Sequence, residues 1–300
     1  MDNILTKKIV KFNGGLGNQM FQYAFASSIA YEYGIDVAFD FSYFDDVKLH
    51  DEVTTRYFEL DVFNLNCKSA TKEDLAQIKR PEFDSKLKNS FAKKFPAMFG
   101  INFYREKNNT CFNRSLVNND VYAYYDGYFQ NEKYFKHLRP HLLNDFSLKI
   151  AIDEKNKAML EKISKPDSVS IHIRRGDYVT LDYVNKMHGE CTLEYYEKAI
   201  EYIAKRVKSP HFFLFSDDIQ WVIENLKINY PFTIVDFNQG KGWFDLNLMK
   251  SCKHNIIANS SFSWWGAWLN ESSSKIVIAP KKWSAKKQRC DIVPREWIKL

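Results

Sequence analysis

From residue 169 to the C-terminus, short apolar segments alternate with segments of helical periodicity. The apolar segments predict strands over 169–173, 211–215, 232–235, 255–258 and 275–279. The intervening segments predict helices over 193–207, through Leu226, over 243–252 and from Asn259 onward. Strands separated by helices of this length are typical of a doubly wound parallel sheet.

The first half of the chain predicts a second sheet of the same kind. Residues 8–12 read as a strand, a glycine-rich loop follows, and an apolar helical face then runs from Phe21 to a stop at Gly34. Residues 45–110 show no clear period. We therefore expect an α/β protein with two domains, 1–150 and 151–300, linked near 145–166, with a ligand bound between them near the carboxyl ends of the strands.

Charge and cysteine content narrow the functional class. The chain has 300 residues, with 43 lysines and arginines against 37 acidic residues, a net charge of +6. This balance fits an anionic small ligand or contact with an acidic membrane surface, and not a nucleic-acid binder. The five cysteines are scattered and form no C-x-x-C pair, which indicates a reducing compartment without a disulfide framework or a structural zinc site.

The glycine loop, residues 14–20, resembles part of a dinucleotide-binding fingerprint. Gly15 and Gly17 have the right spacing, but Met20 replaces the third glycine. One interpretation is a tight turn between strand and helix. The other is a backbone that a sugar–phosphate approaches closely, with Asn18 and Gln19 as polar groups in the ligand cleft.

A pair of arginines follows the predicted strand 169–173, in the run from His172 to Tyr178. Arginine forks bind phosphate oxygens in bidentate fashion, so Arg174 and Arg175 indicate a diphosphate ligand. The alternative is a set of ion pairs with Asp177.

Three further motifs have structural alternatives. Asp245 could accept two hydrogen bonds from guanine, or it could simply favour the start of a helix. Asn259, Ser260 and Ser261 could present free N–H groups to phosphate, or cap the helix that follows. Ser216-Asp217-Asp218 reads first as a helix cap, and we expect Trp264, Trp265 and Trp268 in the core.

Taken together, the motifs resemble those of the bacterial α-1,2-fucosyltransferases of glycosyltransferase family 11. They occur in the expected order along nearly the whole chain: residues 14–24, 127–130 (Gly-Tyr-Phe-Gln), 172–178, 215–218 and 256–265. The resemblance implies a GT-B fold, in which two Rossmann-like domains face each other across a cleft and the donor binds the C-terminal one. It also implies GDP-fucose as donor, a terminal β-galactose as acceptor and no required metal. The absence of any Asp-x-Asp motif agrees with the last point.

The resemblance also implies roles for single residues. His172 and Asp245 would contact guanine, Arg174 would hold the β-phosphate with Arg175 beside it, and Asn18 would lie near the fucose. Asp182 and Asp177 are the candidates for a general base. The remaining donor-binding candidates are Gly15, Gly17, Gln19, Asn259, Ser260, Ser261 and Phe262.

The function expected is inverting, metal-independent transfer of L-fucose to the 2-hydroxyl of galactose, with a role in O-antigen or lipopolysaccharide synthesis. We expect a cytoplasmic enzyme, with peripheral contact at the inner membrane as an option, because the N-terminus has no apolar segment of a signal peptide. The alternatives are an NAD(P)-dependent oxidoreductase, suggested by the glycine loop, and a non-catalytic GDP- or glycan-binding module.

Overall fold

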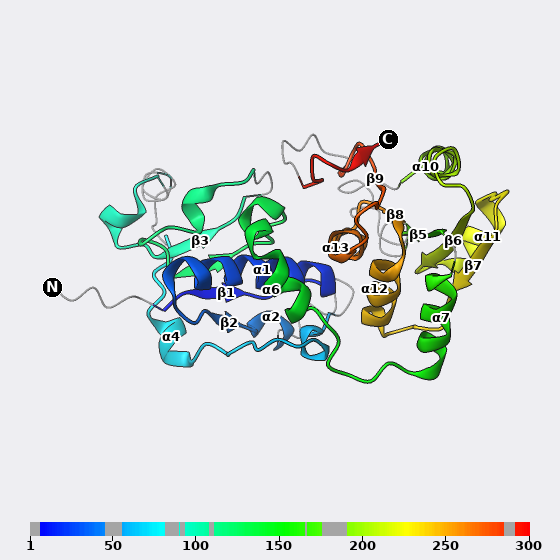
Figure 1. The fold of residues 1–300 in the computed structure, drawn as a ribbon. Helices are drawn as coiled ribbons and strands as arrows, with labels where there is room; N and C mark the ends of the chain where they lie inside the picture. The colour runs from blue at the N-terminus through cyan, green and yellow to red at the C-terminus, as the bar shows by residue number, and fades with distance from the viewer. Residues whose placement is uncertain are drawn as a thin grey trace. The chain divides into compact units, whose positions relative to one another are not determined.

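The chain divides into two compact units, Met1–Ser147 and Leu148–Leu300. This computed structural model describes residues 7–45, 56–81, 90, 94–107, 111–165, 167–175, 191–284 and 292–300 (Figure 1). Both units are built from parallel strands with helical crossovers, so the α/β class expected from the sequence is confirmed.

The first unit contains a four-stranded parallel sheet in the order β2-β1-β4-β3. Its strands are β1 (Ile9–Lys11), β2 (Ala38–Asp40), β3 (Phe103–Arg105) and β4 (Tyr124–Asp126). Its α-helices are α1 (Leu16–Tyr33), α2 (Ser42–Asp45), α4 (Lys72–Ala76) and α6 (Arg139–Asp145). The described part of this unit also contains the 3-10 helices η1 (Leu60–Val62), η2 (Pro96–Phe99), η3 (Arg114–Leu116), η4 (Glu132–Tyr134) and η5 (Lys136–Leu138).

Helix α1 is largely buried, and aromatic rings fill the space around it. Phe25 stacks on Phe129 at 3.9 Å between ring centroids, and Phe12 stacks on Phe39 at 4.5 Å. Gly34 ends the helix with a φ of 63°, as the sequence predicts, because glycine adopts this left-handed conformation without a steric penalty.

The second unit contains a six-stranded parallel sheet in the order β10-β9-β8-β5-β6-β7. Numbered from its own first strand this is 3-2-1-4-5-6 read from the β7 edge, the order of the dinucleotide-binding Rossmann sheet. The strands are β5 (Asp167–Ile173), β6 (Pro210–Ser216), β7 (Phe232–Val235), β8 (His254–Ile256), β9 (Val277–Ala279) and β10 (Ile298–Lys299). The helices are α7 (Glu154–Ser164), α10 (Leu193–Ala204), α11 (Ile219–Asn225), α12 (Gly242–Ser251) and α13 (Ser261–Leu269).

Alternate residues of the strands face two different helix layers. Val169 and Ile171 of β5 belong to a core that includes α10 and α11. Ser170 points the other way and accepts a hydrogen bond from Asn255, whose side chain also donates to the Met249 carbonyl of α12. Helix α12 in turn packs on α7 and α13 (Figure 1). This period-two alternation explains why the strand reads as continuously buried.

Strands β3 and β10 escape prediction for a physical reason. β10 has only two residues, and β3 has three in a region without periodicity, so neither offers an alternation to detect. The tryptophans behave as expected: Trp264 and Trp265 are completely buried and Trp268 nearly so.

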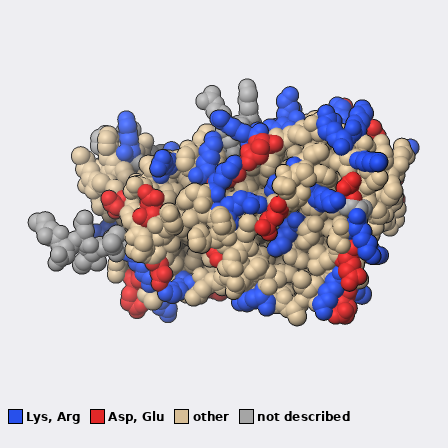
Figure 2. Space-filling view, in the orientation of Figure 1, with Lys and Arg blue, Asp and Glu red and all other residues tan. Residues whose placement is uncertain are grey.

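The described helices include none that combines the length and apolarity needed to cross a bilayer. On the face shown in Figure 2, acidic side chains are interspersed among the lysines and arginines.

Candidate active site

The second unit gathers its sequence-predicted residues at the carboxyl ends of β5 and β8. These strands are neighbours, and the chain order reverses between them. In open α/β sheets, ligands bind in the crevice at such a reversal. His172, Arg174 and Arg175 lie at the end of β5, and Asn259 to Phe262 follow β8.

His172 is buried and neutral. Its backbone carbonyl accepts a hydrogen bond from the Tyr196 hydroxyl at 3.2 Å, and its ring lies 5.5 Å from that of Phe262. The pKa of His172 is lowered to about 4, mainly by burial; Asp217 opposes this shift, and Arg174 makes a smaller contribution in the same direction as burial. The Nδ1 atom is buried without a hydrogen-bond partner among the described residues. Because such an atom is costly, a bound ligand is a natural partner.

The two arginines have different environments. Arg174 Nη1 lies 2.7 Å from Asp217 Oδ2, and both side chains are about one quarter exposed. Arg175 is more enclosed: its guanidinium lies 3.7 Å from the centroid of the Trp221 ring, and its Nε lies 3.3 Å from Asp218 Oδ2. Its backbone N–H donates to Asp217 at 2.8 Å. Arg174 is thus the better placed for a ligand, and Arg175 secures the start of α11.

The helix cap predicted at Ser216-Asp217-Asp218 is formed by one of the two carboxylates. Asp218 caps α11 as expected, because its side chain accepts the Trp221 N–H at 3.2 Å. Asp217 instead pairs with Arg174, so the ion pairs form with this acidic pair within the second unit.

The N-termini of α12 and α13 converge. A Cβ at Gly242 would lie 3.5 Å from the Phe262 ring, so this glycine allows close approach. Asp245 lies in the first turn of α12 and accepts a hydrogen bond from Asn238 at 2.8 Å. Burial raises the pKa of Asp245 to about 6, and the Asn238 bond opposes the rise. The carboxylate is therefore largely ionised at neutral pH.

Helix α13 begins without a side-chain cap. Ser260 occupies the N-cap position but forms no capping hydrogen bond with its side chain, so the capping interpretation of Ser260 is wrong. By contrast, Asp153, Thr192 and Asp218 cap α7, α10 and α11. An uncapped first turn presents N–H groups and the positive end of the helix dipole, which suit a phosphate. Asn259 is nearly buried and donates to the Trp283 carbonyl at 3.3 Å.

The glycine loop of the first unit is occupied by its own chain. The Leu16 N–H at the start of α1 donates to Glu59 at 3.0 Å, so a carboxylate already fills this helix N-terminus. Gln19 is completely buried: its amide donates to the carbonyls of Gly14 and Tyr57 and accepts from the Glu59 N–H. Gln19 thus holds the loop together, and its predicted role toward a ligand stays a prediction.

Asn18 remains partly accessible in the same loop. Its Oδ1 accepts a hydrogen bond from Gln130 at 2.8 Å, which joins the loop after β1 to the loop after β4. These strands are neighbours at the reversal point of the first sheet. Gly15 begins α1 in an extended conformation and Gly17 is buried within it, and their roles toward a donor stay predictions. A cleft shared with the second unit also stays a prediction.

Two predicted residues, Asp177 and Asp182, lie outside the described residues. Within the described ranges, no group of three or more His, Cys, Asp or Glu side chains could hold a metal ion. Sequence reasoning missed Asn238, Trp221 and Glu59, because isolated residues of common types carry no motif.

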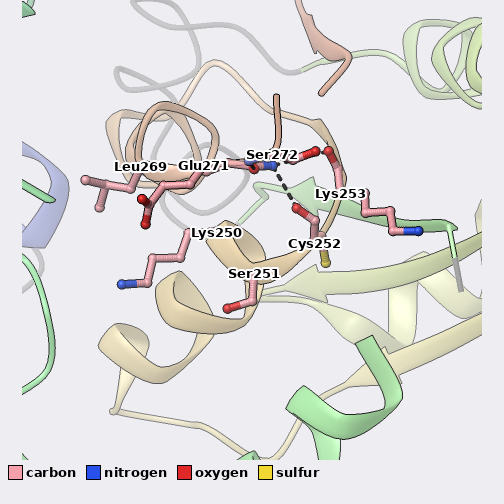
Figure 3. A pocket seen from close by; sticks show the side chains of 8 residues that line it. Lys250, Ser251, Cys252, Lys253, Leu269, Glu271 and Ser272 are labelled. Carbon is pink, nitrogen blue, oxygen red and sulfur yellow. Dashed lines mark hydrogen bonds between the residues drawn. The ribbon is translucent and has the colours of Figure 1, made fainter. Parts of the chain in front are cut away.

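A pocket of about 360 Å³ lies at the opposite ends of the same two helices (Figure 3). It is lined by the last residues of α12 and α13 and those that follow, among them Lys250, Lys253 and Glu271. Helix C-termini repel anions, so this pocket is not suited to a diphosphate.

Comparison with known proteins identifies the family. Residues 7–300 match the family Glycosyl transferase family 11. The chain belongs to this family. An Escherichia coli protein named alpha-1,2-colitosyltransferase is 34% identical over 97% of this chain and 98% of its own length. The O-antigen biosynthesis glycosyltransferase WbnK of Escherichia coli is also 34% identical, over 96% of this chain and 98% of its own.

The family 11 chain also resembles animal enzymes over part of its length. Galactoside 2-alpha-L-fucosyltransferase Sec1 of Mus musculus is 31% identical over 49% of this chain and 42% of that protein. Among solved structures, NodZ alpha-1,6-fucosyltransferase soaked with GDP-fucose overlaps with a TM-score of 0.47 at 15% identity, covering 88% of this chain and 92% of that one. The family 11 protein is therefore a glycosyltransferase, and the resemblance found in its motifs is confirmed.

Proposed function

We propose that this enzyme transfers L-fucose from GDP-β-L-fucose to the 2-hydroxyl of a terminal β-galactose, forming an α-1,2 linkage. Membership of family 11 supplies the reaction class. The observation that carries the donor assignment is the convergence of His172, Arg174 and Asp245 with the uncapped start of α13 at the strand-order reversal of the second sheet.

Each part of the donor has a chemically matched partner in this site. The ionised Asp245 can accept hydrogen bonds from the N1–H and the amino group of guanine. The neutral His172 can exchange one further hydrogen bond through Nδ1. Arg174 and the backbone N–H groups of Ser261 and Phe262 would hold the diphosphate, since cations and helix N-termini both attract phosphate.

The transfer step is a single displacement with inversion. The acceptor 2-oxygen forms a bond to C1 of fucose on the face opposite GDP, and the bond from C1 to the phosphate oxygen breaks. GDP leaves with the electron pair, and Arg174 and the helix amides stabilise its growing negative charge. The hydroxyl proton passes to a general base, for which Asp182 and Asp177 are the candidates. Asn18 would lie near the fucose and the reacting hydroxyl.

We propose that the reaction needs no metal, because Arg174 and the start of α13 supply the positive potential that a divalent ion would otherwise give. In the presence of EDTA, turnover should stay within about twofold of the untreated enzyme. Loss of activity in EDTA that magnesium or manganese restores would refute this part of the proposal.

The acceptor is expected to be a galactose-terminated glycan or glycolipid. Relatives include an O-antigen biosynthesis glycosyltransferase, so we place the reaction in O-antigen assembly. Such acceptors are lipid-linked, which would bring a cytoplasmic enzyme to the inner membrane by peripheral contact.

Colitose is the second candidate sugar, because a full-length relative is named an alpha-1,2-colitosyltransferase. GDP-fucose and GDP-colitose offered in competition would decide between them by the ratio of kcat/KM values.

The deciding experiment incubates the enzyme with GDP-fucose and a panel of β-galactosides, including a 2-deoxygalactoside as control. We expect GDP release and an α-1,2-linked product by NMR, with no reaction of the 2-deoxy compound. Binding of GDP without transfer to any galactoside would favour the non-catalytic module. Binding of NADH in preference to GDP would favour the oxidoreductase.

A further inference from the structure

We propose that a buried pair of asparagine side chains, Asn156 and Asn238, positions the Asp245 carboxylate for recognition of the guanine edge. This inference rests on the proposed function, in which Asp245 binds the base. Asn238 and Asn156 do not touch the donor themselves and are positioning residues.

The three side chains form a continuous hydrogen-bonded line. Asn238 Nδ2 donates to Asp245 Oδ1 at 2.8 Å and to Asn156 Oδ1 at 3.0 Å. Asn156 Nδ2 donates back to Asn238 Oδ1 at 2.9 Å and to Asp153 Oδ1 at 3.0 Å. Asn156 is 1% exposed and Asn238 5%, so the two amides bond to each other away from solvent.

The line has only one favourable orientation. A carboxylate accepts a hydrogen bond at each end of the line: Asp153 accepts from Asn156, and Asp245 accepts from Asn238. Each amide donates one N–H to its carboxylate and one to the other amide. Rotating the Asn238 amide by half a turn would point its oxygen at Asp245. The two carboxylates therefore fix the amide pair, and the amide pair fixes Asp245.

The hydrogen-bonded line also connects helix α7 to the segment before α12 and to the first turn of α12. Asn156 lies in the first turn of α7, Asn238 lies between β7 and α12, and Asp245 lies in the first turn of α12. Because α7 packs on α12, the amide pair sets the position of the α12 start relative to a second helix.

The same bonds control the charge of Asp245. Burial alone would push the pKa of Asp245 above the value of about 6, and the Asn238 bond restrains that rise. The charged side chains next to the line, among the described residues, are Asp153 and Lys241. Hydrogen bonds from the backbone and side chain of Asn156 lower the pKa of Asp153, and the positive charge of Lys241 lowers it to a smaller extent. Removing the Asn238 amide should therefore raise the pKa of Asp245. The carboxyl group would then be protonated at a higher pH, and the guanine site would lose one hydrogen-bond acceptor.

The test compares binding of GDP and IDP by calorimetry, because IDP lacks the amino group that the carboxylate would bind. We expect wild-type protein and the matched control Asn270→Ala to prefer GDP by about 10- to 100-fold, the range of a hydrogen bond to a charged group. Asn270 is a buried, hydrogen-bonded asparagine at the other end of α12 and α13, so this variant reports the general cost of deleting such a residue.

Asn238→Ala and the isosteric Asn238→Asp should reduce the GDP preference by about 10-fold, with the larger effect for Asp because two carboxylates would then face each other. Both should shift the loss of GDP binding at low pH to a higher pH. If Asn238→Ala does not fold, Asn156→Ser should give the same two changes in weaker form.

The outcomes separate the two hypotheses. If Asp245→Ala loses the preference for GDP but Asn238→Ala and Asn238→Asp keep both the preference and the pH profile, the positioning role is refuted. If Asp245→Ala keeps the preference, the assignment of Asp245 in the proposed function fails, and the positioning role fails with it.

Discussion

At the scale of single residues, the adjacent arginines give the sharpest prediction. Arg174→Ala should lower kcat/KM for GDP-fucose by about 100-fold or more, because it removes a cation from the leaving group. Its melting temperature should stay close to that of wild type, since the partly exposed pair with Asp217 contributes little to stability. Steady-state kinetics with a melting curve check both points. Unchanged kinetics would remove Arg174 from the site.

Arg175→Ala should behave differently and lose stability. Its guanidinium stacks on Trp221 and contacts Asp218, so its removal loosens the start of α11, by about 1–2 kcal/mol. Arg206→Ala is the matched control, because Arg206 stacks on Tyr202 at 3.5 Å away from the site. Denaturant unfolding should show a larger loss for Arg175→Ala. If both variants lose the same free energy of unfolding, the contacts of Arg175 stabilise the fold no more than the surface contact of Arg206 does.

His172 predicts a pH dependence of stability. Its pKa of about 4 in the folded protein lies below the unfolded value near 6.5, so the unfolded chain binds the proton more readily. The contribution of His172 to the free energy of unfolding is therefore fully present above pH 6.5. It decreases by about 1–3 kcal/mol as the pH falls toward 4. Unfolding of wild type and His172→Asn should therefore converge at low pH. If the difference in the free energy of unfolding between wild type and His172→Asn stays constant from pH 7 to 4.5, this prediction is wrong.

At the scale of elements, the sequence predicts more of the second unit than of the first. Apolar runs such as 169–173 and 211–215 locate their strands because burial on both faces leaves a continuous signal. Trp264 and Trp265 are predictable as core for the same reason. The candidate site is predictable where motifs mark it, as at His172 and Arg174. It is not predictable at Asn238 or Glu59, whose roles arise only when distant segments meet.

The uncapped start of α13 can be tested by capping it. Ser260→Asp would place a carboxylate where the first-turn N–H groups are presented, which stabilises a helix by about 0.5–1 kcal/mol. If these groups bind the diphosphate, GDP affinity should fall by at least about 10-fold while the melting temperature stays the same or rises. Thr192→Asp is the control, because Thr192 already caps α10. Equal GDP affinity in both variants would place the diphosphate elsewhere.

At the scale of the whole molecule, each unit has a strand-order reversal with a glycine- or serine-containing loop beside it. Among the described residues, the helix start at one of these reversals is occupied by a carboxylate, and the other lacks a side-chain cap. In the first unit Glu59 occupies the start of α1, whereas α13 in the second unit lacks a side-chain cap. A phosphate at α1 would have to displace a carboxylate. The glycine loop, which alone suggests a dinucleotide, is therefore the weaker of the two anion sites.

This asymmetry predicts where GDP protects the chain. GDP at about 100 times its Kd should stabilise the region that binds it by about 2.7 kcal/mol. Amide hydrogen exchange followed by mass spectrometry should slow at the ends of β5 and β8 and in the first turns of α12 and α13. Exchange in β1 and the loop from Gly14 to Gln19 should change little, and NADH should protect neither unit. Protection confined to the Gly14–Gln19 loop would instead assign the nucleotide to the first unit, where its phosphates would compete with Glu59 for the Leu16 N–H.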